Sequence, residues 1–202
     1  EALIPRKETE ILGYAALDTL REKVRVDGGA TVIDLCTGCG NLALALAHHE
    51  PGCQVFAADL SPDAVDLARR NARHLELEAR VSFHVGDLFG PFDHDGFRES
   101  VDLVVCNPPY ISTQHIPEMP EEIHAYEPQL AFDGGPFGVE VVFRLIKEAP
   151  RFLKPQSWLC FEVGLGQGEL IVRKLARNNA YGEIKALTDA QGATRAILAR
   201  RV

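Results

Sequence analysis

Apolar side chains recur along the chain in two patterns, short β-branched runs and longer stretches with helical spacing. The short runs lie at residues 31–35, 54–59, 81–85, 101–106, 158–163, 184–187 and 196–199. Each has the length of a buried strand, and helical stretches separate most of them. The alternation predicts an α/β fold with a doubly wound, mostly parallel seven-stranded sheet. We expect the last two runs to form a C-terminal antiparallel hairpin.

Local signals place the helices between these strands. The spacing over residues 8–24 predicts a first helix that Gly28-Gly29 stops. Asn41 is a plausible cap for a second helix, and Ser61-Pro62-Asp63 has the cap, first-turn proline and acid that open a third. Further helices are predicted over residues 138–153 and from Gly168 to about Asn178.

The chain has the organisation of a single domain, residues 1–202. Residues 1–29 are interpreted as a lead-in segment and helix. Residues 111–137, directly after the fourth strand, form a long irregular insertion, and loops of more than about 15 residues are usually functional or mobile. We place this insertion on the substrate side and interpret Glu118 to Glu127 within it as a solvated acidic face.

Composition and charge narrow the function classes. Hydrophobic residues make up 46% and charged residues 25%, the balance of a soluble globular domain. No apolar run approaches the roughly 20 residues of a membrane span. Five scattered cysteines predict reduced thiols and a cytoplasmic location. The net charge of −8, with no basic cluster, argues against direct nucleic acid binding. The chain opens with Glu1 and not Met, which favours a fragment or a trimmed product.

A glycine loop follows the first predicted strand. Gly38-Cys39-Gly40, with Ala43 three residues further on, fits the pattern by which nucleotide folds turn from a strand into a helix. Alone, this pattern is equally typical of an ordinary tight turn. Asp59 ends the next strand, where an acid can bind ribose hydroxyls, and this strengthens the nucleotide interpretation.

A second acid selects among nucleotide cofactors. Asp34 lies inside the first strand, just before the loop, where a negative charge opposes binding of a pyrophosphate. It suits a ligand that carries a sulfonium and an ammonium group. Asp87, which follows the third strand, can accept a hydrogen bond from an adenine amino group or simply cap the next loop. The three acids therefore favour S-adenosylmethionine over NAD.

The fourth strand ends in Asn107-Pro108-Pro109-Tyr110. Two prolines cannot continue a sheet ladder, so the backbone leaves the sheet extended and stiff. An amide side chain, carbonyl groups outside any helix and an aromatic ring are then held together. They can bind a flat, neutral group that forms hydrogen bonds.

Taken together, these motifs resemble the class I S-adenosylmethionine-dependent methyltransferases. Within that class the chain is similar to the HemK-type glutamine N5-methyltransferases, which modify peptide chain release factors. The closer resemblance also rests on Leu3-Ile4-Pro5-Arg6-Lys7-Glu8-Thr9-Glu10, Glu127-Pro128, Leu130-Ala131, Gly134-Gly135, Leu153-Lys154-Pro155, Glu162-Val163-Gly164 and Gln167. The departures are Lys7 in place of a common proline and cysteines at 36 and 39 in place of small residues. The family's helical N-terminal domain is expected to be absent.

The resemblance implies a site and a reaction. Asn107, Pro108, Pro109 and Tyr110 would be catalytic, the Asn107 oxygen and the Pro108 carbonyl accepting the two N–H groups of a substrate amide. S-adenosylmethionine is the implied cofactor, a release factor with its Gly-Gly-Gln tripeptide the implied partner, and no metal is expected. The implied cofactor-binding residues are Asp34, Cys36, Thr37, Gly38, Cys39, Gly40, Asp59, Asp87, Leu88 and Asn107.

Other interpretations remain open at this point. The same motifs serve N-methylation of adenine or a small molecule, and the fold admits an NAD enzyme or a non-catalytic module that binds the cofactor. Cys36-x-x-Cys39 matches half of a redox or zinc motif, but no second close pair exists. Arg6 and Glu10 could line a substrate channel or form a structural ion pair.

Overall fold

The structure is a computed structural model that describes residue 6, residues 8–119 and residues 128–202. Most of the segment before Thr9, and residues 120–127 of the 111–137 insertion with most of its acidic face, lie outside the described residues. Within the described part, no helix is long and apolar enough to cross a lipid bilayer.

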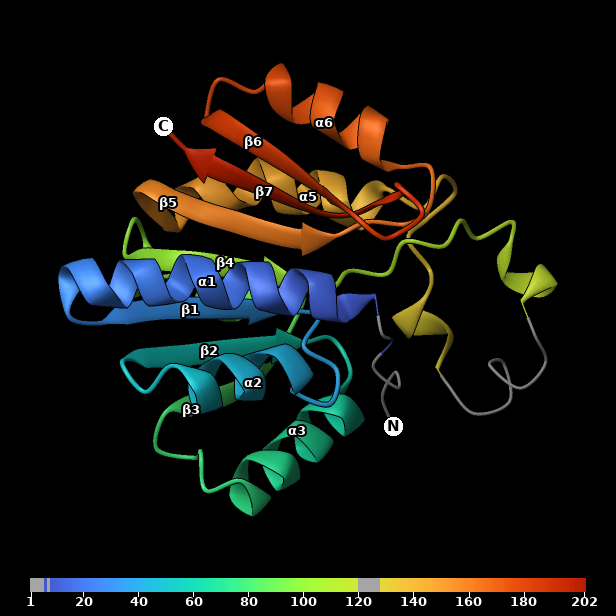
Figure 1. Ribbon diagram of the computed structural model, residues 1–202. Coiled ribbons are helices and arrows are strands. Elements are labelled where there is room, and N and C mark those ends of the chain that lie inside the picture. The colour runs from blue at the N-terminus through green and yellow to red at the C-terminus, as the bar shows by residue number, and fades with distance from the viewer. Residues whose placement is uncertain (1–5, 7, 120–127) are drawn as a thin grey trace.

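One sheet of seven strands forms the centre of the molecule (Figure 1). The strands are β1 (Ala30–Leu35), β2 (Cys53–Asp59), β3 (Val81–Val85), β4 (Val101–Cys106), β5 (Leu153–Glu162), β6 (Tyr181–Thr188) and β7 (Thr194–Arg201). Their order is β3-β2-β1-β4-β5-β7-β6. The first five pair in parallel, and β7 is antiparallel to both β5 and β6. The predicted fold class and the C-terminal hairpin are therefore confirmed.

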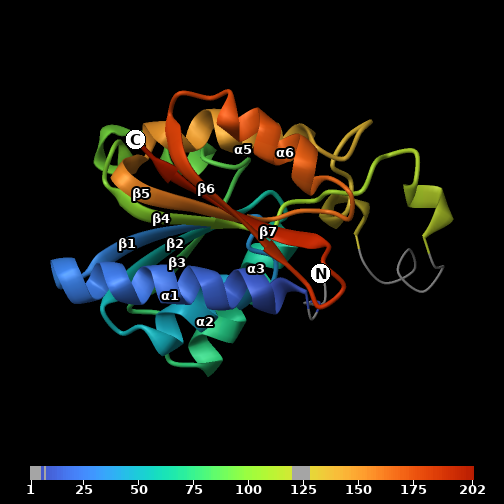
Figure 2. The same cartoon turned by 45° about the horizontal axis from the view of Figure 1, so that its top comes forward.

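Helices cover both faces of the sheet (Figure 2). They are α1 (Thr9–Asp27), α2 (Asn41–His49), α3 (Pro62–His74), α5 (Glu140–Glu148) and α6 (Gly168–Ala176). The first three share a buried apolar cluster on one face, around Val32, Val55 and Val105. The last two share the cluster on the other face, around Ile33 and Val104. Alternate residues of β1 and β4 thus point to opposite layers, as the side-chain period of a strand requires.

Local signals set the helix boundaries as expected in two cases. Gly28 ends α1 in a left-handed conformation, with φ 79°, and its N–H donates to the carbonyl of Val24. Ser61 caps α3, since its hydroxyl accepts from the N–H of Ala64 and Pro62 occupies the first turn.

The boundaries that differ from the prediction include three with a local cause. The N-cap of α2 is Gly40, and Asn41 is already inside the helix without capping it. The helix predicted over 138–153 is α5 followed by a short 3₁₀ turn at Ala149–Arg151. The fifth strand begins at Leu153, because Leu153 pairs with Val101 before the register shifts. The intervening residues interrupt the ladder, which is why the sequence pattern alone recognised only its second half.

The sheet topology fixes where a ligand can bind. β1 and β4 are neighbours in space, and the crossovers that leave them cover opposite faces. A crevice forms at such a switch point, outside the carboxyl ends of the strands. The glycine loop follows β1 and Asn107-Pro108-Pro109-Tyr110 follows β4, so both motifs meet at this crevice.

Candidate active site

Strand register brings three chain segments to one level. Leu35 pairs with Cys106, and Cys106 pairs with Phe161. The next residues are therefore Cys36 just after β1, Asn107 just after β4 and Glu162 at the end of β5. The glycine loop and the Asn107-Pro108-Pro109-Tyr110 motif are consequently placed side by side by strand pairing.

The Asp34 carboxyl group forms hydrogen bonds to residues at both ends of the glycine loop. The Asp34 Oδ2 accepts from the hydroxyl of Thr37 at 2.5 Å and from the N–H of Ala43 at 3.2 Å. Gly40 closes the turn with φ 85°, and a Cβ there would approach Ala68 and the Phe83 ring to 3.1 Å. Glycine is thus required at Gly40 by conformation and by packing.

Asp59 ties the same loop to β2. Its Oδ2 accepts from the N–H of Gly38 at 2.8 Å, and its Oδ1 accepts from the N–H of Ser61 at 2.9 Å. The carboxylate therefore orders both the loop and the start of α3. Each oxygen retains a second lone pair, so a ribose hydroxyl can still donate to it.

The Asp34 carboxyl group has an unmet hydrogen-bonding capacity. It is fully buried, and its Oδ1 has no hydrogen-bond partner within the described residues. Burial raises the pKa of Asp34 from 3.8 to about 7, since desolvation outweighs the bonds from Thr37 and Ala43. A cation near this carboxyl group would favour its ionised form. The observed geometry therefore fits the charge of S-adenosylmethionine.

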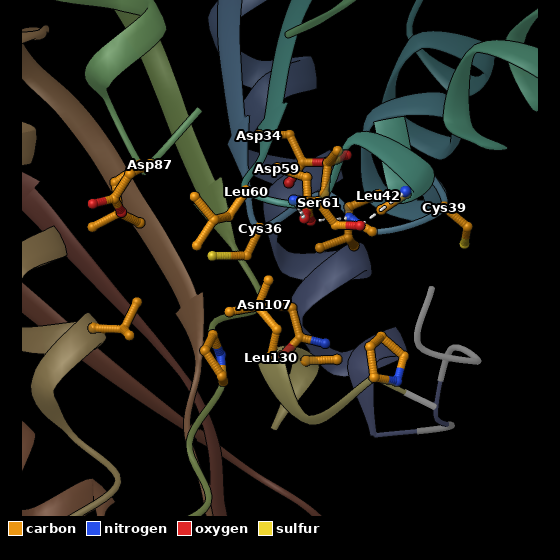
Figure 3. A pocket seen from close by; sticks show the side chains of 18 of the residues that line it. Asp34, Cys36, Cys39, Leu42, Asp59, Leu60, Ser61, Asp87, Asn107 and Leu130 are labelled. Carbon is orange, nitrogen blue, oxygen red and sulfur yellow. Dashed lines mark hydrogen bonds between the residues drawn. The ribbon is translucent and has the colours of Figure 1, made fainter. Parts of the chain in front are cut away.

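These residues line one pocket (Figure 3). Figure 3 shows Asp34, Asp59 and Ser61 gathered on one side and Asn107 with Leu130 on another, with Cys36 between them in this view. The predicted site residues that line it are Asp34, Cys36, Thr37, Gly38, Cys39, Asp59, Asp87, Leu88, Asn107 and Pro109. Gly40 supports the loop without lining the pocket.

Two lining residues have unusual backbone conformations. Cys36 has φ 55° and Leu88 has φ 46°, although neither is glycine. Such conformations cost on the order of 1–3 kcal/mol and persist where the surrounding structure fixes them. Both follow strands that point into the pocket, so the strain is located where the chain must turn to form the pocket wall.

Asp87 already has a partner in this structure. Its Oδ2 accepts from the Arg144 guanidinium of α5 at 2.8 Å, and both side chains are about half exposed. Pairs of this kind are weak and exchange readily with other partners. Asp87 therefore lines the pocket while one of its oxygens accepts from Arg144.

Asn107 forms part of the walls of two pockets. The second pocket is lined by Arg6, Met119, Ala131 and Phe132 with the remaining site residues, Pro108 and Tyr110. Asn107 and Ala131 border both pockets. The two pockets therefore share a wall that includes Asn107. Arg6 lines the second pocket, and Arg6 and Glu10 both line a third hollow along α1 and α2.

The redox or zinc interpretation of Cys36-x-x-Cys39 gains no support. Burial raises the pKa of the Cys39 thiol, which disfavours the thiolate that redox chemistry and zinc binding need. The two side chains lie apart across the pocket in Figure 3. The described residues contain no group of three or more metal-binding side chains that could hold an ion.

Sequence reasoning assigned no role to two polar residues that contact the Asn107-Pro108-Pro109-Tyr110 motif. Thr9 begins α1 and is 4% exposed, and Glu162 ends β5 and is 2% exposed. Thr9 contacts Asn107, and Glu162 contacts Tyr110. Both residues belong to segments that carried the family resemblance, and that resemblance was the only available signal.

The Gln167 side chain connects Tyr110, at the end of the Asn107-Pro108-Pro109-Tyr110 motif, to two later segments of the chain. Its Nε2 donates to the carbonyls of Tyr110 at 2.8 Å and Gly138 at 3.0 Å, and its Oε1 accepts from the N–H of Gly164. One side chain thereby joins the exit of the 111–137 insertion to the end of β4.

Comparison with known proteins agrees with this site. Residues 26–196 match the family described as a methyltransferase domain. A release factor glutamine methyltransferase from Moorella thermoacetica is 40% identical over 200 residues, covering 98% of this chain and 67% of that protein. A ribosomal protein uL3 glutamine methyltransferase from Bradyrhizobium diazoefficiens is 43% identical over 136 residues, 67% of this chain and 41% of that protein.

A solved structure supports the fold. The S-adenosylmethionine-dependent O-methyltransferase from Thermotoga maritima superposes with a TM-score of 0.65 at 15% identity, covering 100% of this chain and 67% of that one. At this identity the likeness concerns the fold alone.

The fold, the glycine loop and the family match together define a class I methyltransferase that uses S-adenosylmethionine. Within that class, the chain belongs to the release factor glutamine methyltransferase family. It spans about two thirds or less of the length of the curated relatives described above.

Proposed function

We propose that this chain transfers a methyl group from S-adenosylmethionine to the side-chain N5 of a protein glutamine, the one in the Gly-Gly-Gln tripeptide of a release factor. The observation that carries the proposal is the position of Asn107, whose amide borders both the cofactor pocket and the second pocket. The family membership, with a relative named for release factor glutamine, supports the choice of substrate.

The cofactor is proposed to bind along the carboxyl ends of β1, β2 and β3. The Asp34 carboxylate would balance the positive charge of the cofactor. Asp59 would accept hydrogen bonds from the ribose hydroxyls, and Asp87 with Leu88 would contact the adenine. When bound, S-adenosylmethionine supplies an electrophilic methyl group on a positively charged sulfur. Cys36 and the Thr37–Cys39 part of the loop, with the Asn107 side chain, line the same pocket and complete the proposed contacts.

The substrate amide is proposed to bind at the end of β4. An amide nitrogen is a poor nucleophile because its lone pair is delocalised. The Asn107 side-chain oxygen and the Pro108 carbonyl would accept its two N–H groups and orient the lone pair towards the methyl carbon. Tyr110 would pack against the planar group. Orientation and fixed dipoles then provide most of the rate.

A titrating base is not part of this proposal. Burial and the neighbouring Glu162 raise the pKa of Tyr110 well above its ordinary value, so the phenol keeps its proton at neutral pH. Glu162 accepts from Thr9 and Tyr110, one bond at each oxygen. Both groups therefore serve the site as fixed hydrogen-bonding partners.

The partner and its approach follow from the second pocket. We propose that residues 111–137 form the substrate side of the domain, since Ile111, Met119 and Phe132 line this pocket. The mostly apolar lining suits the aliphatic part of a glutamine side chain. A release factor acts in translation, so the proposed location is the cytoplasm.

The test is methyl transfer to purified release factor. The chain is incubated with labelled S-adenosylmethionine and either the natural factor or a variant whose tripeptide is Gly-Gly-Ala. We expect stoichiometric labelling of the natural factor, a 14 Da mass increase on the Gly-Gly-Gln peptide, and no labelling of the variant. Equal labelling of both factors, or labelling of neither, would overturn the substrate assignment.

A further inference from the structure

A buried hydrogen-bonded chain connects the two ends of the catalytic motif through other elements. The Thr9 hydroxyl donates to Glu162 Oε2 at 2.7 Å, and the Tyr110 hydroxyl donates to Glu162 Oε1 at 3.1 Å. The Asn107 Nδ2 donates to Thr9 Oγ1 at 3.4 Å. The chain therefore runs from Asn107 through Thr9 and Glu162 to Tyr110.

The direction of every bond in this chain is fixed by chemistry. An ionised carboxylate can only accept, so both hydroxyls must donate to Glu162. A hydroxyl can donate one hydrogen bond, and the Thr9 hydroxyl donates its bond to Glu162. Thr9 can then only accept from Asn107, so the NH₂ side of the Asn107 amide must face Thr9. Because the amide is planar, its oxygen faces the other way.

We propose that Thr9 and Glu162 are positioning residues that set the polarity of the Asn107 amide, so that its oxygen and not its NH₂ group faces the substrate. This inference rests on the proposed function, since it specifies how the same site selects a substrate group that donates a hydrogen bond. Neither residue touches the substrate in this scheme, and both act through Asn107.

The architecture explains why these residues meet. Glu162 lies one step beyond the pairing of Cys106 with Phe161, at the level of Asn107. Thr9 is the first residue of α1, which packs on the face of the sheet formed by β4 and β5. The two side chains are 153 positions apart in sequence, and the contact exists only in the folded sheet.

The surroundings of Glu162 act on its pKa in both directions. Burial and the nearby Glu8 raise the pKa, while the bonds from Thr9 and Tyr110 and the charge of Arg195 on β7 lower it. The acceptor role rests on the geometry, since each oxygen faces one hydroxyl. Arg195 is itself bound to Asp189 at 2.7 Å. A neutral residue at 162 would satisfy packing equally well but could not impose one direction on both hydroxyls.

The first variant to measure is Glu162→Gln. Its amide offers one acceptor and one donor, so one of the two hydroxyls loses its fixed direction. We expect kcat with release factor to fall at least about tenfold, while the cofactor Kd changes less than about twofold. The thermal midpoint should stay level or rise, because a buried charge is removed. A purely structural role for Glu162 predicts instead that kcat is retained and that the thermal midpoint falls.

The second pair of variants is Thr9→Val and Thr9→Ser. Valine keeps the shape but removes the hydroxyl, and we expect kcat to fall about ten- to a hundredfold. Serine restores the hydroxyl and should recover most of the rate. Thr19→Val is the matched control, since the Thr19 hydroxyl donates within α1 to the carbonyl of Ala15 and lies outside the site. Its rate should equal that of the unaltered chain.

A readout without substrate separates this inference from the proposed function. The side-chain NH₂ resonances of Asn107, identified by their loss in Asn107→Asp, should shift in Thr9→Val and in Glu162→Gln but stay in place in Thr19→Val. Unshifted resonances together with kcat values within twofold of the unaltered chain would overturn the inference. If no release factor is methylated but the resonances shift, the polarity assignment stands and only the substrate is wrong.

Discussion

At the scale of single residues, Asp34 and Glu162 place carboxyl groups in the buried interior. Both are almost completely buried, at 0% and 2% exposure, and each has a raised pKa. They differ in how well they are satisfied. Glu162 has a donor at each oxygen, whereas one oxygen of Asp34 has no partner among the described residues. The unsatisfied group is the one beside the cofactor pocket.

The Asn107 amide is predicted to dominate turnover. Asn107→Ala removes an oriented acceptor from the substrate nitrogen, and losing one such bond costs on the order of 10²–10³ in rate. We expect that loss in kcat at saturating cofactor, where a weaker cofactor contact no longer limits the rate. Stopped-assay kinetics with release factor measure kcat. Turnover within a few-fold of the unaltered chain would refute this role for Asn107.

Asp34 is predicted to couple stability to pH. Its pKa is raised from 3.8 to about 7 on folding, so the folded state holds the proton more tightly. The free energy of unfolding therefore loses a contribution as the pH rises from about 4 to about 7. In Asp34→Asn this loss should be absent, which leaves the cofactor-free variant several degrees more stable than the unaltered chain at pH 8.

The same substitution, Asp34→Asn, should weaken binding of the cofactor. Loss of a buried charge facing a cation predicts a roughly ten- to hundredfold higher Kd for S-adenosylmethionine. Thermal unfolding from pH 4 to 8 and isothermal titration measure the two effects. Asp87→Asn, at an exposed acid, is the control for the pH dependence. A destabilised Asp34→Asn chain at pH 8 would contradict the account.

At the scale of elements, β4 and the segment after it are held by side chains from later in the chain. Gln167 joins the end of β4 to Gly138, at the far end of the 111–137 insertion. The fit is close, because a Cβ on Gly138 would lie 2.4 Å from the Tyr110 carbonyl oxygen. The geometry of Tyr110 thus depends on a side chain that begins α6.

Gln167→Glu tests this clamp. A carboxylate would set an acceptor against two carbonyls that now receive N–H bonds, so we expect the segment to separate from β4. The predicted results are a roughly tenfold lower kcat, an unchanged cofactor Kd and faster amide exchange in residues 128–138. Gln191→Glu, in the exposed turn between β6 and β7, should behave like the unaltered chain. Unchanged exchange in both variants would show that the clamp has no role.

The sequence predicts elements and strand ends better than contacts between distant elements. Asp34, Asp59 and Asn107 could be placed at one sheet edge because each lies at or near the end of a buried run and parallel strands end at the same side. The prediction that Asn41 caps α2 was wrong, because the glycine turn itself places the N-cap at Gly40. Thr9 and Glu162 could not be joined from sequence, because their contact depends on the β4–β5 register and on where α1 begins.

At the scale of the whole molecule, three strands contribute loops to the cofactor pocket. Residues after β1, β2 and β3 line it, together with Asn107 after β4. A ligand that binds them all stabilises the fold in proportion to its affinity, by about 2.7 kcal/mol at a hundred times its Kd. We expect S-adenosylmethionine to raise the thermal midpoint by several degrees and NAD to leave it unchanged. A shift with NAD alone would contradict the assignment of the cofactor.

The central claim is that the methyl group is attached to a side-chain amide nitrogen. Release factor methylated by this chain with methyl-labelled S-adenosylmethionine is hydrolysed completely in acid, and the label is identified. Hydrolysis of an N5-methylated glutamine breaks its amide bond, so the predicted result is labelled methylamine with unlabelled glutamate. Label recovered as methanol, or retained on an amino acid, would contradict methylation at the glutamine N5.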